Sequence, residues 1–378
     1  MAILFLRLKK RTISEFPFLK MSDRDFLEFV YREILDREID PEGMATYTRL
    51  LEQGQTRWEV LMFLIHSGEF TNRVLSDNLP PPNIKSLKPK NYVQATDSRT
   101  ARQALIFEAR QSADFDWLEQ MIRETGYYER PGVWSFDLDM DKKVLAEIIA
   151  FFSQKRALEI GCANGVVLKC LFQAGVDVEG VDISARAKAH AFPEIRNRIQ
   201  LGDFLELVLP ADHYDLIFGL DIFEHFNPNR IEAIVQKIFE KLTSVGYLFC
   251  NIPAFGPDPV FGNLFPLYLE AWGKDASENR PFQTLHADEW GYPLNGHLIW
   301  ADSFWWVHQM ERPGFIREVE IEQALHQKYD AYFEVKAPAR KAFYVFSKKA
   351  DQEKNRRIIQ TIQRTPSSVL ENLEESPP

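Results

Sequence analysis

The sequence contains little cysteine. Only three cysteines occur among its 378 residues, Cys162, Cys170 and Cys250. No two of them form a CxxC pair, and their spacing matches neither a zinc site nor a disulfide framework. Because unpaired thiols are typical of a reducing compartment, we expect a cytoplasmic protein.

Long apolar runs and an excess of positive charge are also lacking. No segment reaches the roughly 18 apolar residues of a membrane-spanning helix. The opening MAILFLRLKKR places its apolar run before its basic residues, the reverse of a secretory signal. The formal net charge of −10 opposes binding to phosphate backbones, because that binding depends on lysine and arginine replacing counterions. We therefore predict neither a membrane span nor a nucleic-acid partner.

What is present is the composition of a folded protein with two domains. The chain is 45% hydrophobic and 26% charged, close to the averages for globular proteins. Its 378 residues exceed what one core usually holds. Prolines and polar residues predict a linker over residues 77–100. The mostly polar stretch 350–378 predicts a frayed helix and a mobile tail.

Residues 22–76 have the pattern of a small all-α domain, preceded by an N-terminal extension over residues 1–21. Three capping signals predict three short helices: Ser22 with Asp25, Asp40 before Pro41, and Thr56 with Glu59. The stretch from FVYREIL to LIHSGEF resembles a bacterial helical family of unknown function. That family is akin to phycobilisome linker domains and is often fused to glycosyltransferases or methyltransferases. Binding of a protein partner is the role that we expect for this domain.

The most informative segment runs from Arg156 to Ile183 and reads RALEIGCANGVVLKCLFQAGVDVEGVDI. Its order of strand, glycine turn, helix and strand is typical of a nucleotide-binding fold. Gly161 and Gly165 flank a turn where missing side chains let the backbone approach a ligand. Asp182 ends the second strand, where a carboxylate can accept hydrogen bonds from both ribose hydroxyls of an adenosine.

The glycine pattern separates two adenosine-containing cofactors. A dinucleotide fingerprint needs glycine at positions 163 and 166, where this chain has Ala163 and Val166. A pyrophosphate is therefore less well accommodated than the methionine portion of S-adenosylmethionine. The segment resembles motif I of the class I S-adenosylmethionine-dependent methyltransferases, in which an acidic residue, here Glu159, stands two positions before the glycine-rich turn.

Three later stretches extend this resemblance over residues 101–349. IQLGDFLEL, YDLIFGLDIFEHF and RKAFYVFSKK match a third strand, a fourth strand with its exit, and a final antiparallel strand. The resemblance implies a Rossmann-like α/β fold with a seven-stranded sheet, an antiparallel last strand and S-adenosylmethionine at the carboxyl ends of the strands. It implies that Asp203 binds the adenine amino group, with Phe204 beside the ring. The cofactor-binding residues that it implies are Glu159, Gly161, Cys162, Ala163, Gly165, Asp182, Ile183, Asp203, Phe204 and Leu220.

The candidate catalytic residues follow from the same resemblance. Glu224 and His225 follow the fourth strand, and His297 precedes a predicted helix. If the acceptor is a hydroxyl its proton must leave, and His225 is the first candidate for the base, with His297 the second. Tyr127 and Tyr128 belong to a segment that closes over the cofactor in such enzymes.

Residues 254–300 form an insertion much longer than the usual connection and rich in aromatic side chains. Two interpretations stay open, a surface that binds the acceptor and simple packing onto the sheet. Within the insertion His286, Asp288 and Glu289 lie near His297, but their spacing matches no zinc motif. We therefore expect no metal site.

Together these patterns predict an O- or N-methyltransferase that acts on a small molecule, with a glycan or glycan precursor as the first candidate acceptor. Two alternatives remain. One is an NAD-dependent Rossmann oxidoreductase, which would bind NAD in place of S-adenosylmethionine. The other is a non-catalytic scaffold that keeps the cofactor fold while its helical domain binds a partner.

Overall fold

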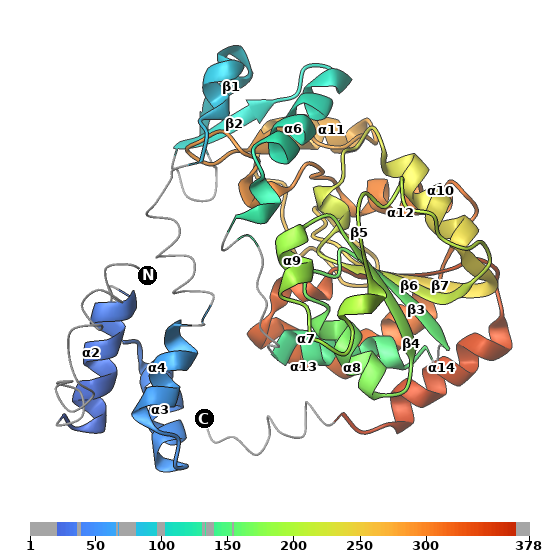
Figure 1. The fold of residues 1–378 in the computed structure, drawn as a ribbon. Coiled ribbons are helices and arrows are strands. Elements are labelled where there is room, and N and C mark those ends of the chain that lie inside the picture. Colours follow the sequence, from blue (N-terminus) through green and yellow to red (C-terminus); the bar gives the residue numbers. More distant parts are fainter. Residues whose placement is uncertain are drawn as a thin grey trace. The chain divides into compact units, whose positions relative to one another are not determined.

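The computed structural model describes residues 21–35, 39–65, 67, 81–96, 103–130, 133, 140–152 and 155–367. The chain divides into two compact units, the first made of Met1–Pro81 with Arg130–Ser135 and the second of Pro82–Glu129 with Phe136–Pro378 (Figure 1). No helix in the described part of the chain is long and apolar enough to cross a membrane.

Three short helices make up the described part of the first unit, as predicted: α2 (Asp23–Leu35), α3 (Pro41–Glu52) and α4 (Arg57–Ile65). The predicted caps are in place. The Gly43 amide donates to Asp40 over 2.7 Å, and the Thr56 amide donates to the Glu59 carboxylate over 2.7 Å. Apolar side chains from α2 and α4 form the core of this unit, including Phe26, Val30, Val60 and Leu64.

A seven-stranded sheet forms the centre of the second unit, with the order β5-β4-β3-β6-β7-β10-β9. The first five strands of this order are parallel, and β10 is antiparallel to both of its neighbours. The predicted sheet and its antiparallel last strand are therefore confirmed. The strands are β3 (Arg156–Ile160), β4 (Asp177–Asp182), β5 (Ile199–Leu201), β6 (Tyr214–Leu220), β7 (Leu242–Asn251), β9 (Ile316–Arg317) and β10 (Phe343–Ser347).

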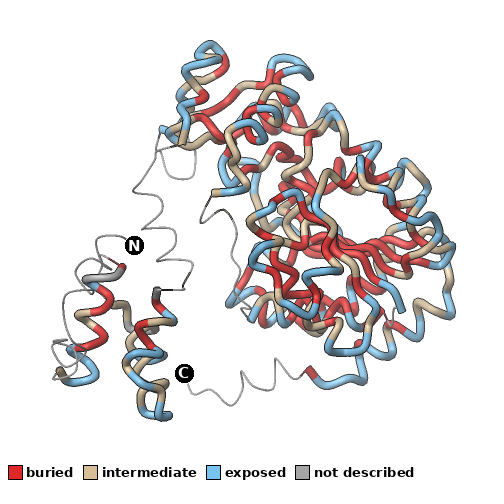
Figure 2. Tube along the Cα trace, viewed as in Figure 1, coloured by how far each residue is buried: buried red, intermediate tan, exposed pale blue. Residues whose placement is uncertain are grey.

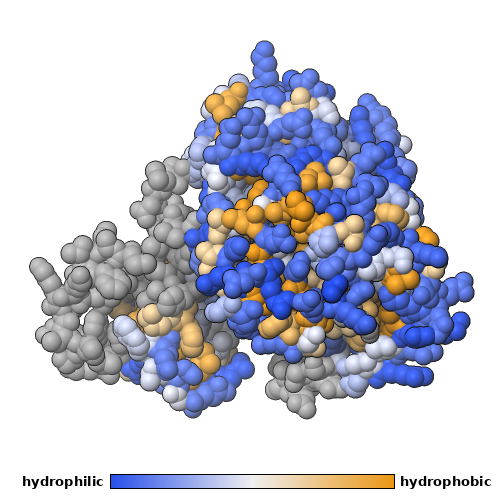
Figure 3. All heavy atoms as spheres, turned by 45° about the vertical axis from the view of Figure 1, so that its right-hand side comes forward, coloured by the Kyte–Doolittle hydropathy of each residue, from blue (hydrophilic) through white to orange (hydrophobic). Residues whose placement is uncertain are grey.

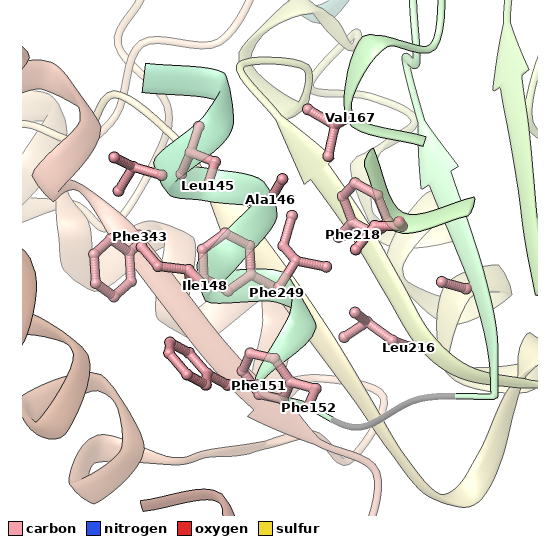
Figure 4. Close-up of a cluster of buried hydrophobic side chains, with 14 of the residues drawn as sticks. Leu145, Ala146, Ile148, Phe151, Phe152, Val167, Leu216, Phe218, Phe249 and Phe343 are labelled. Atoms are coloured by element: carbon pink, nitrogen blue, oxygen red, sulfur yellow. The ribbon is translucent and has the colours of Figure 1, made fainter. Parts of the chain in front are cut away.

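Helices cover both faces of this sheet, because its central strands are apolar on both sides. Leu216 and Phe218 of β6 belong to one buried cluster, and Ile217 between them belongs to the other. Figure 4 shows the first cluster, where Ile148 lies beside Phe249 and Phe343. The first face carries α7 (Met140–Ala150), α8 (Val166–Gln173), α13 (Val319–Lys336) and α14 (Gln352–Arg364), and the second α10 (Ile231–Lys241) and α12 (Ser303–Glu311).

A second, smaller sheet combines two distant parts of the chain. Its strands β1 (Tyr92–Thr96), β2 (Gln103–Glu108) and β8 (Thr284–His286) pair antiparallel. With α6 (Ser112–Glu124) and α11 (Glu270–Ser277) they form an accessory lobe, made of the described residues of 82–129 and 254–300 (Figure 1). The aromatic side chains of the insertion pack into the core of this lobe: Phe255, Trp272, Phe282, Tyr292 and Trp300.

Two predicted boundaries need correction. Residues 82–96 were expected in the linker 77–100, but Ile84 is buried in the lobe and Tyr92–Thr96 pair with β2. Residues 352–364 were expected to form a frayed helix within the tail 350–378, but the helix that they form, α14, is docked on the core. That helix is polar overall, yet it places Ile358 and Ile362 on one face against the core. A surface helix usually has three to four apolar residues in every two turns on its buried face. In α14 two isoleucines suffice, because the sheet and the other helices already form the core.

The helix after β6, α10, begins at Ile231, although Asn227 before Pro228 has the sequence pattern of a helix cap. The Asn227 side chain accepts a hydrogen bond from the Asn229 amide and donates to Asp116 and Glu119 of α6. It therefore stabilises a turn and a contact with the lobe instead of capping the helix.

Buried and exposed residues follow this layered arrangement of sheet and helices. In Figure 2 the strands of the large sheet are almost entirely buried, and the outer surfaces of its helices are exposed. Figure 3 shows a coloured surface that is mostly hydrophilic, with apolar groups gathered in several areas, the most extensive near the centre of the view.

Candidate active site

The glycine-rich turn joins β3 to α8 at the carboxyl edge of the large sheet. The Gly161 and Cys162 amides donate to the Val181 carbonyl over 2.8 and 3.2 Å, which ties the turn to β4. Gly161, Ala163 and Gly165 have positive φ angles of 70°, 47° and 73°. For alanine such a conformation costs about 1 to 2 kcal/mol, so the surrounding bonds must hold the turn in place.

Gly161 is needed for a second reason, which is close packing against the exit of β6. A Cβ atom at this position would lie 2.4 Å from Cγ1 and 2.9 Å from Cβ of Ile222. We predict that Gly161→Ala destabilises the protein by about 2 to 5 kcal/mol, from the φ angle and overpacking together. Gly175→Ala is the matched control, because its φ is 87° and nothing lies within 4 Å of its added Cβ. It should cost only about 1 to 2 kcal/mol in urea unfolding. Equal losses in the two variants would contradict the packing argument.

Asp182 connects the turn to the end of β4. Its side chain is buried, Oδ2 accepts from the Ala163 amide over 2.7 Å, and Oδ1 accepts from the Ser184 amide over 2.8 Å. Burial raises the pKa of this carboxyl, and the two amide bonds oppose that effect. Each carboxylate oxygen accepts more than one hydrogen bond, so Asp182 retains capacity for a ligand. Its neighbour Ile183 presents an exposed apolar side chain at the same edge.

Glu159 lies on β3 beside Asp182 on β4. It is buried, and Oε2 has no hydrogen-bond partner among the described residues. Burial raises the pKa of Glu159 well above its usual range, and the negative charge of Asp182 adds to this effect. Burial also raises the pKa of the Cys162 thiol in the turn, so this cysteine lacks the thiolate character of a nucleophile. Cys162 therefore behaves as a small buried side chain.

Asp203 follows β5 and lies in a network that the sequence did not indicate. Its Oδ2 accepts from Arg123 of α6 and from Arg230, and Oδ1 accepts from the Leu205 amide over 2.9 Å. Burial alone would raise the pKa of Asp203, but the two guanidinium groups overcome this and lower it. Glu119 of α6 pairs with the same two arginines. No motif marks these partners, because Arg123 comes from the accessory lobe, 80 residues away, and Arg230 is the residue before α10.

Two further residues of the predicted cofactor set face the interior. Phe204 is buried in the cluster under α10, where the Lys237 ammonium lies 5.3 Å from the centre of its ring. Leu220, at the end of β6, is partly buried and packs against the opposite cluster. Both residues therefore shape the core beneath the carboxyl edge.

Glu224, His225 and His297 come together beyond the end of β6. Glu224 and His225 lie in the short helix η7 (Phe223–His225) after β6, and His297 follows η8 (Leu294–Gly296). One ligand atom from each lies within 4.8 Å of the others, and the two imidazole rings meet edge to face at 4.8 Å. The predicted catalytic residues thus form one cluster, although 72 positions separate the histidines.

Burial dominates the electrostatics of this cluster. It lowers the pKa of His225 to about 3, with the charge of His297 adding to the effect, and it lowers the pKa of His297 to about 4. It raises the pKa of Glu224 well above its usual range, and the negative charge of Asp221 adds to this. Both imidazoles are therefore neutral at pH 7.

A short segment links the cofactor edge to this cluster. In η5 (Tyr127–Glu129) the Tyr128 carbonyl accepts from the Ser184 hydroxyl over 3.0 Å, and the Tyr128 ring lies edge-on to His225 with centroids 6.1 Å apart. The Glu129 carboxylate accepts from two amides at the start of α9 (Ala185–Ala189).

The other histidine group considered in the sequence has structural contacts of its own. His286 Nε2 lies 2.9 Å from the Tyr268 hydroxyl, and Asp288 Oδ1 accepts from the Trp290 and Tyr292 amides. Among the described residues, Glu224, His225 and His297 are the group whose side chains could hold a metal ion together.

Comparison with known proteins agrees with this geometry. A family model described as a methyltransferase domain matches residues 136–327, just over half of the chain, and a model described as a domain of unknown function matches residues 15–74. A ubiquinone biosynthesis O-methyltransferase of Leptothrix cholodnii is 25% identical over 103 residues, which cover 25% of this chain and 43% of that protein. The chain thus spans less than half the length of that relative.

Two solved structures are similar at lower identity. A SAM-dependent methyltransferase from Archaeoglobus fulgidus is 23% identical with a TM-score of 0.28, over 30% of this chain and 52% of that one. Phosphoethanolamine N-methyltransferase 2 from Haemonchus contortus, in complex with S-adenosyl-L-methionine, is 14% identical with a TM-score of 0.36, over 68% of this chain and 57% of that one.

Proposed function

Because the chain belongs to the methyltransferase-domain family, we propose that it transfers the methyl group of S-adenosylmethionine to an oxygen or nitrogen atom of a small acceptor. The observation that carries this proposal is the carboxyl edge of the sheet. There a strained turn, the Asp182 carboxylate and the cluster of Glu224, His225 and His297 lie around consecutive strand ends. Open α/β sheets bind ligands at this edge.

The residues of the turn fit this cofactor. The bonds of Asp182 to the Ala163 and Ser184 amides orient its carboxylate, which leaves lone pairs for the two ribose hydroxyls. Glu159 brings a buried oxygen without a hydrogen-bond partner among the described residues, and the cationic methionine portion would offset its burial. Asp203 and Ile183 stand at the neighbouring strand ends for the adenine. When bound, S-adenosylmethionine supplies an electrophilic methyl group.

Positioning supplies most of the rate acceleration in this proposal, since proximity and orientation contribute about 7 to 11 kcal/mol. An acceptor lone pair forms the bond to the methyl carbon as the carbon–sulfur bond breaks, and that electron pair stays on sulfur. If the acceptor is a hydroxyl, its proton passes to a base or to solvent. His225 is neutral and takes this role first, with His297 as the second candidate. The low pKa of His225 makes this residue a weak base, so proton transfer is secondary to positioning of the acceptor.

Binding of S-adenosylhomocysteine and NAD, measured side by side by calorimetry, tests the cofactor. We expect S-adenosylhomocysteine to bind and NAD to show no saturable heat. The reverse result would replace this proposal with the oxidoreductase alternative. A screen with tritiated methyl donor against bacterial glycans, glycan precursors and small metabolites then identifies the acceptor, and binding without any transfer would favour a non-catalytic scaffold.

The helical domain of residues 22–76 is proposed to bind a protein partner and to be dispensable for cofactor binding. We predict that deletion of residues 1–76 leaves S-adenosylhomocysteine affinity unchanged. Deletion of residues 1–96 is the matched comparison, because it also removes Ile84 and β1 from the accessory lobe. That longer deletion should lower the melting temperature of the second unit. If the protein that lacks residues 1–76 were insoluble, or did not bind S-adenosylhomocysteine, the prediction would be contradicted.

A further inference from the structure

Glu224 is a buried carboxylate without the partners that burial normally requires. Its exposed fraction is 1%, and neither carboxylate oxygen has a hydrogen-bond partner among the described residues. A guanidinium group could compensate the buried charge, but that of Arg340 donates its hydrogen bonds to Asp221 and Asn251. An ionisable nitrogen faces Glu224 across the cluster: His297 Nε2 lies 3.8 Å from Oε1. A buried carboxylate is costly unless a proton or a cation compensates it.

We propose that Glu224, His225 and His297 bind a divalent first-row transition-metal cation that holds the oxygen of the methyl acceptor. This proposal rests on the proposed methyltransferase function for its role, but not for the binding itself. Two imidazoles and one carboxylate suit Zn²⁺, Mn²⁺, Co²⁺ or Fe²⁺, whereas Ca²⁺ and Mg²⁺ prefer oxygen ligands. Three protein ligands leave coordination positions open for water or substrate.

The geometry needs only small side-chain adjustments. The ligand atoms lie within 4.8 Å of one another, and metal–ligand bonds of about 2.0 to 2.2 Å bring such atoms to roughly 3 to 3.5 Å. Rotation of the side chains can supply this difference. The side chain of His297 remains 18% exposed, which provides a path for the ion.

The backbone around the cluster is held firmly. The Glu224 carbonyl accepts from the Leu298 and Ile299 amides, both over 2.8 Å, so the chain after β6 is fastened to the segment that carries His297. Gly296 allows the close approach, since an added Cβ would lie 2.9 Å from the Tyr127 ring and 3.3 Å from His225 Nδ1. The ligands are thus positioned by bonds that do not depend on an ion.

The cluster also borders the cofactor edge. Ile222, two residues before Glu224, packs against Gly161 of the glycine-rich turn. Tyr128 contacts His225 with its ring and accepts from Ser184, which follows Asp182 and Ile183, with its carbonyl. With a cation bound, His225 and His297 would serve as ligands and not as bases. The cation would lower the pKa of a bound hydroxyl, whose proton then leaves to solvent before the oxygen lone pair attacks the methyl carbon. The acceptor class that fits is a hydroxyl compound with a second neighbouring oxygen that chelates the cation.

The test is direct binding of Co²⁺ and Zn²⁺ to the full chain after treatment with a chelator, measured by calorimetry and by the visible absorption of Co²⁺. We expect one ion per chain. Glu224→Gln should weaken binding by about 100-fold or more, since even the loss of an outer partner costs 10- to 100-fold. Glu224→Asp, which keeps a carboxylate, should recover part of the affinity. His286→Gln is the matched control, because His286 is also a buried histidine and is close in sequence to two other acidic residues, Asp288 and Glu289.

S-adenosylhomocysteine binding, measured on the same samples, reports whether each variant is folded and tests the cofactor separately. Absence of stoichiometric metal binding in a protein that binds S-adenosylhomocysteine would overturn the metal site and leave the proposed function standing. Metal binding that survives Glu224→Gln, or that His286→Gln abolishes, would overturn the assigned ligands. Metal binding without S-adenosylhomocysteine binding would support the site and refute the proposed function.

Discussion

Asparagine in place of Asp182 should weaken S-adenosylhomocysteine binding by about 1.5 to 3 kcal/mol, or roughly 10- to 150-fold, for each charge-assisted ribose bond that is lost. The structure adds a cost in stability. Asp182 accepts from the Ala163 amide with one carboxylate oxygen and from the Ser184 amide with the other. Asparagine has only one acceptor oxygen, so one of these two bonds would be lost. We therefore expect the melting temperature to fall as well. The alanine variant, which loses both bonds, should bind no better than the asparagine variant.

The control for this experiment is Asp177→Asn at the other end of β4. Asp177 is exposed and pairs with Arg198 at the surface, so its loss should leave cofactor affinity near that of the wild type. Calorimetry gives the affinities, and circular dichroism shows whether each variant is folded. If the folded Asp182→Asn protein binds S-adenosylhomocysteine as tightly as the wild type does, the cofactor site lies elsewhere.

Replacing His225 with alanine should lower turnover by about 10²- to 10⁴-fold and leave S-adenosylhomocysteine affinity nearly intact. The reason is that His225 is placed on the proposed acceptor side of the site, in contact with His297 and Tyr128. Turnover is measured with the acceptor found in the methyl-transfer screen. His213→Ala is the control, because His213 contacts Arg156 at the start of β3, the end of the strand opposite the glycine-rich turn. Its loss should leave turnover unchanged.

Three results would change this assignment. If His225→Ala abolished cofactor binding at unchanged stability, the histidine would belong to the cofactor pocket. If turnover were unaffected, His225 would be structural, and His297→Ala would be the next variant. If a chelator lowered wild-type turnover to the level of His225→Ala, and added Co²⁺ or Zn²⁺ restored only the wild type, His225 would act as a metal ligand and not as a base.

Much of the large sheet and the chemistry of its edge could be predicted because the relevant patterns are local. The turn from Gly161 to Gly165 and the strand ending at Asp182 lie within 28 consecutive residues, from Arg156 to Ile183. Their periodicity, glycines and terminal carboxylate report backbone geometry directly. The accessory lobe was not predictable in this way, because β8 joins β2 across more than 170 residues. Its first strand was therefore mistaken for part of a linker.

The sequence by itself determined the strand, turn, helix and strand from β3 to β4, the strained glycine turn and the acidic residues at the strand ends, since neighbouring residues dictate backbone conformation over short distances. Only the tertiary structure decided which distant side chains meet. It paired Asp203 with Arg123 and Arg230, buried Glu224 without a hydrogen-bond partner among the described residues, and placed His297 against His225. Such contacts depend on how the lobe packs against the carboxyl edge of the sheet. No local pattern encodes that packing, because burial and charge pairing arise only when the separate segments come together.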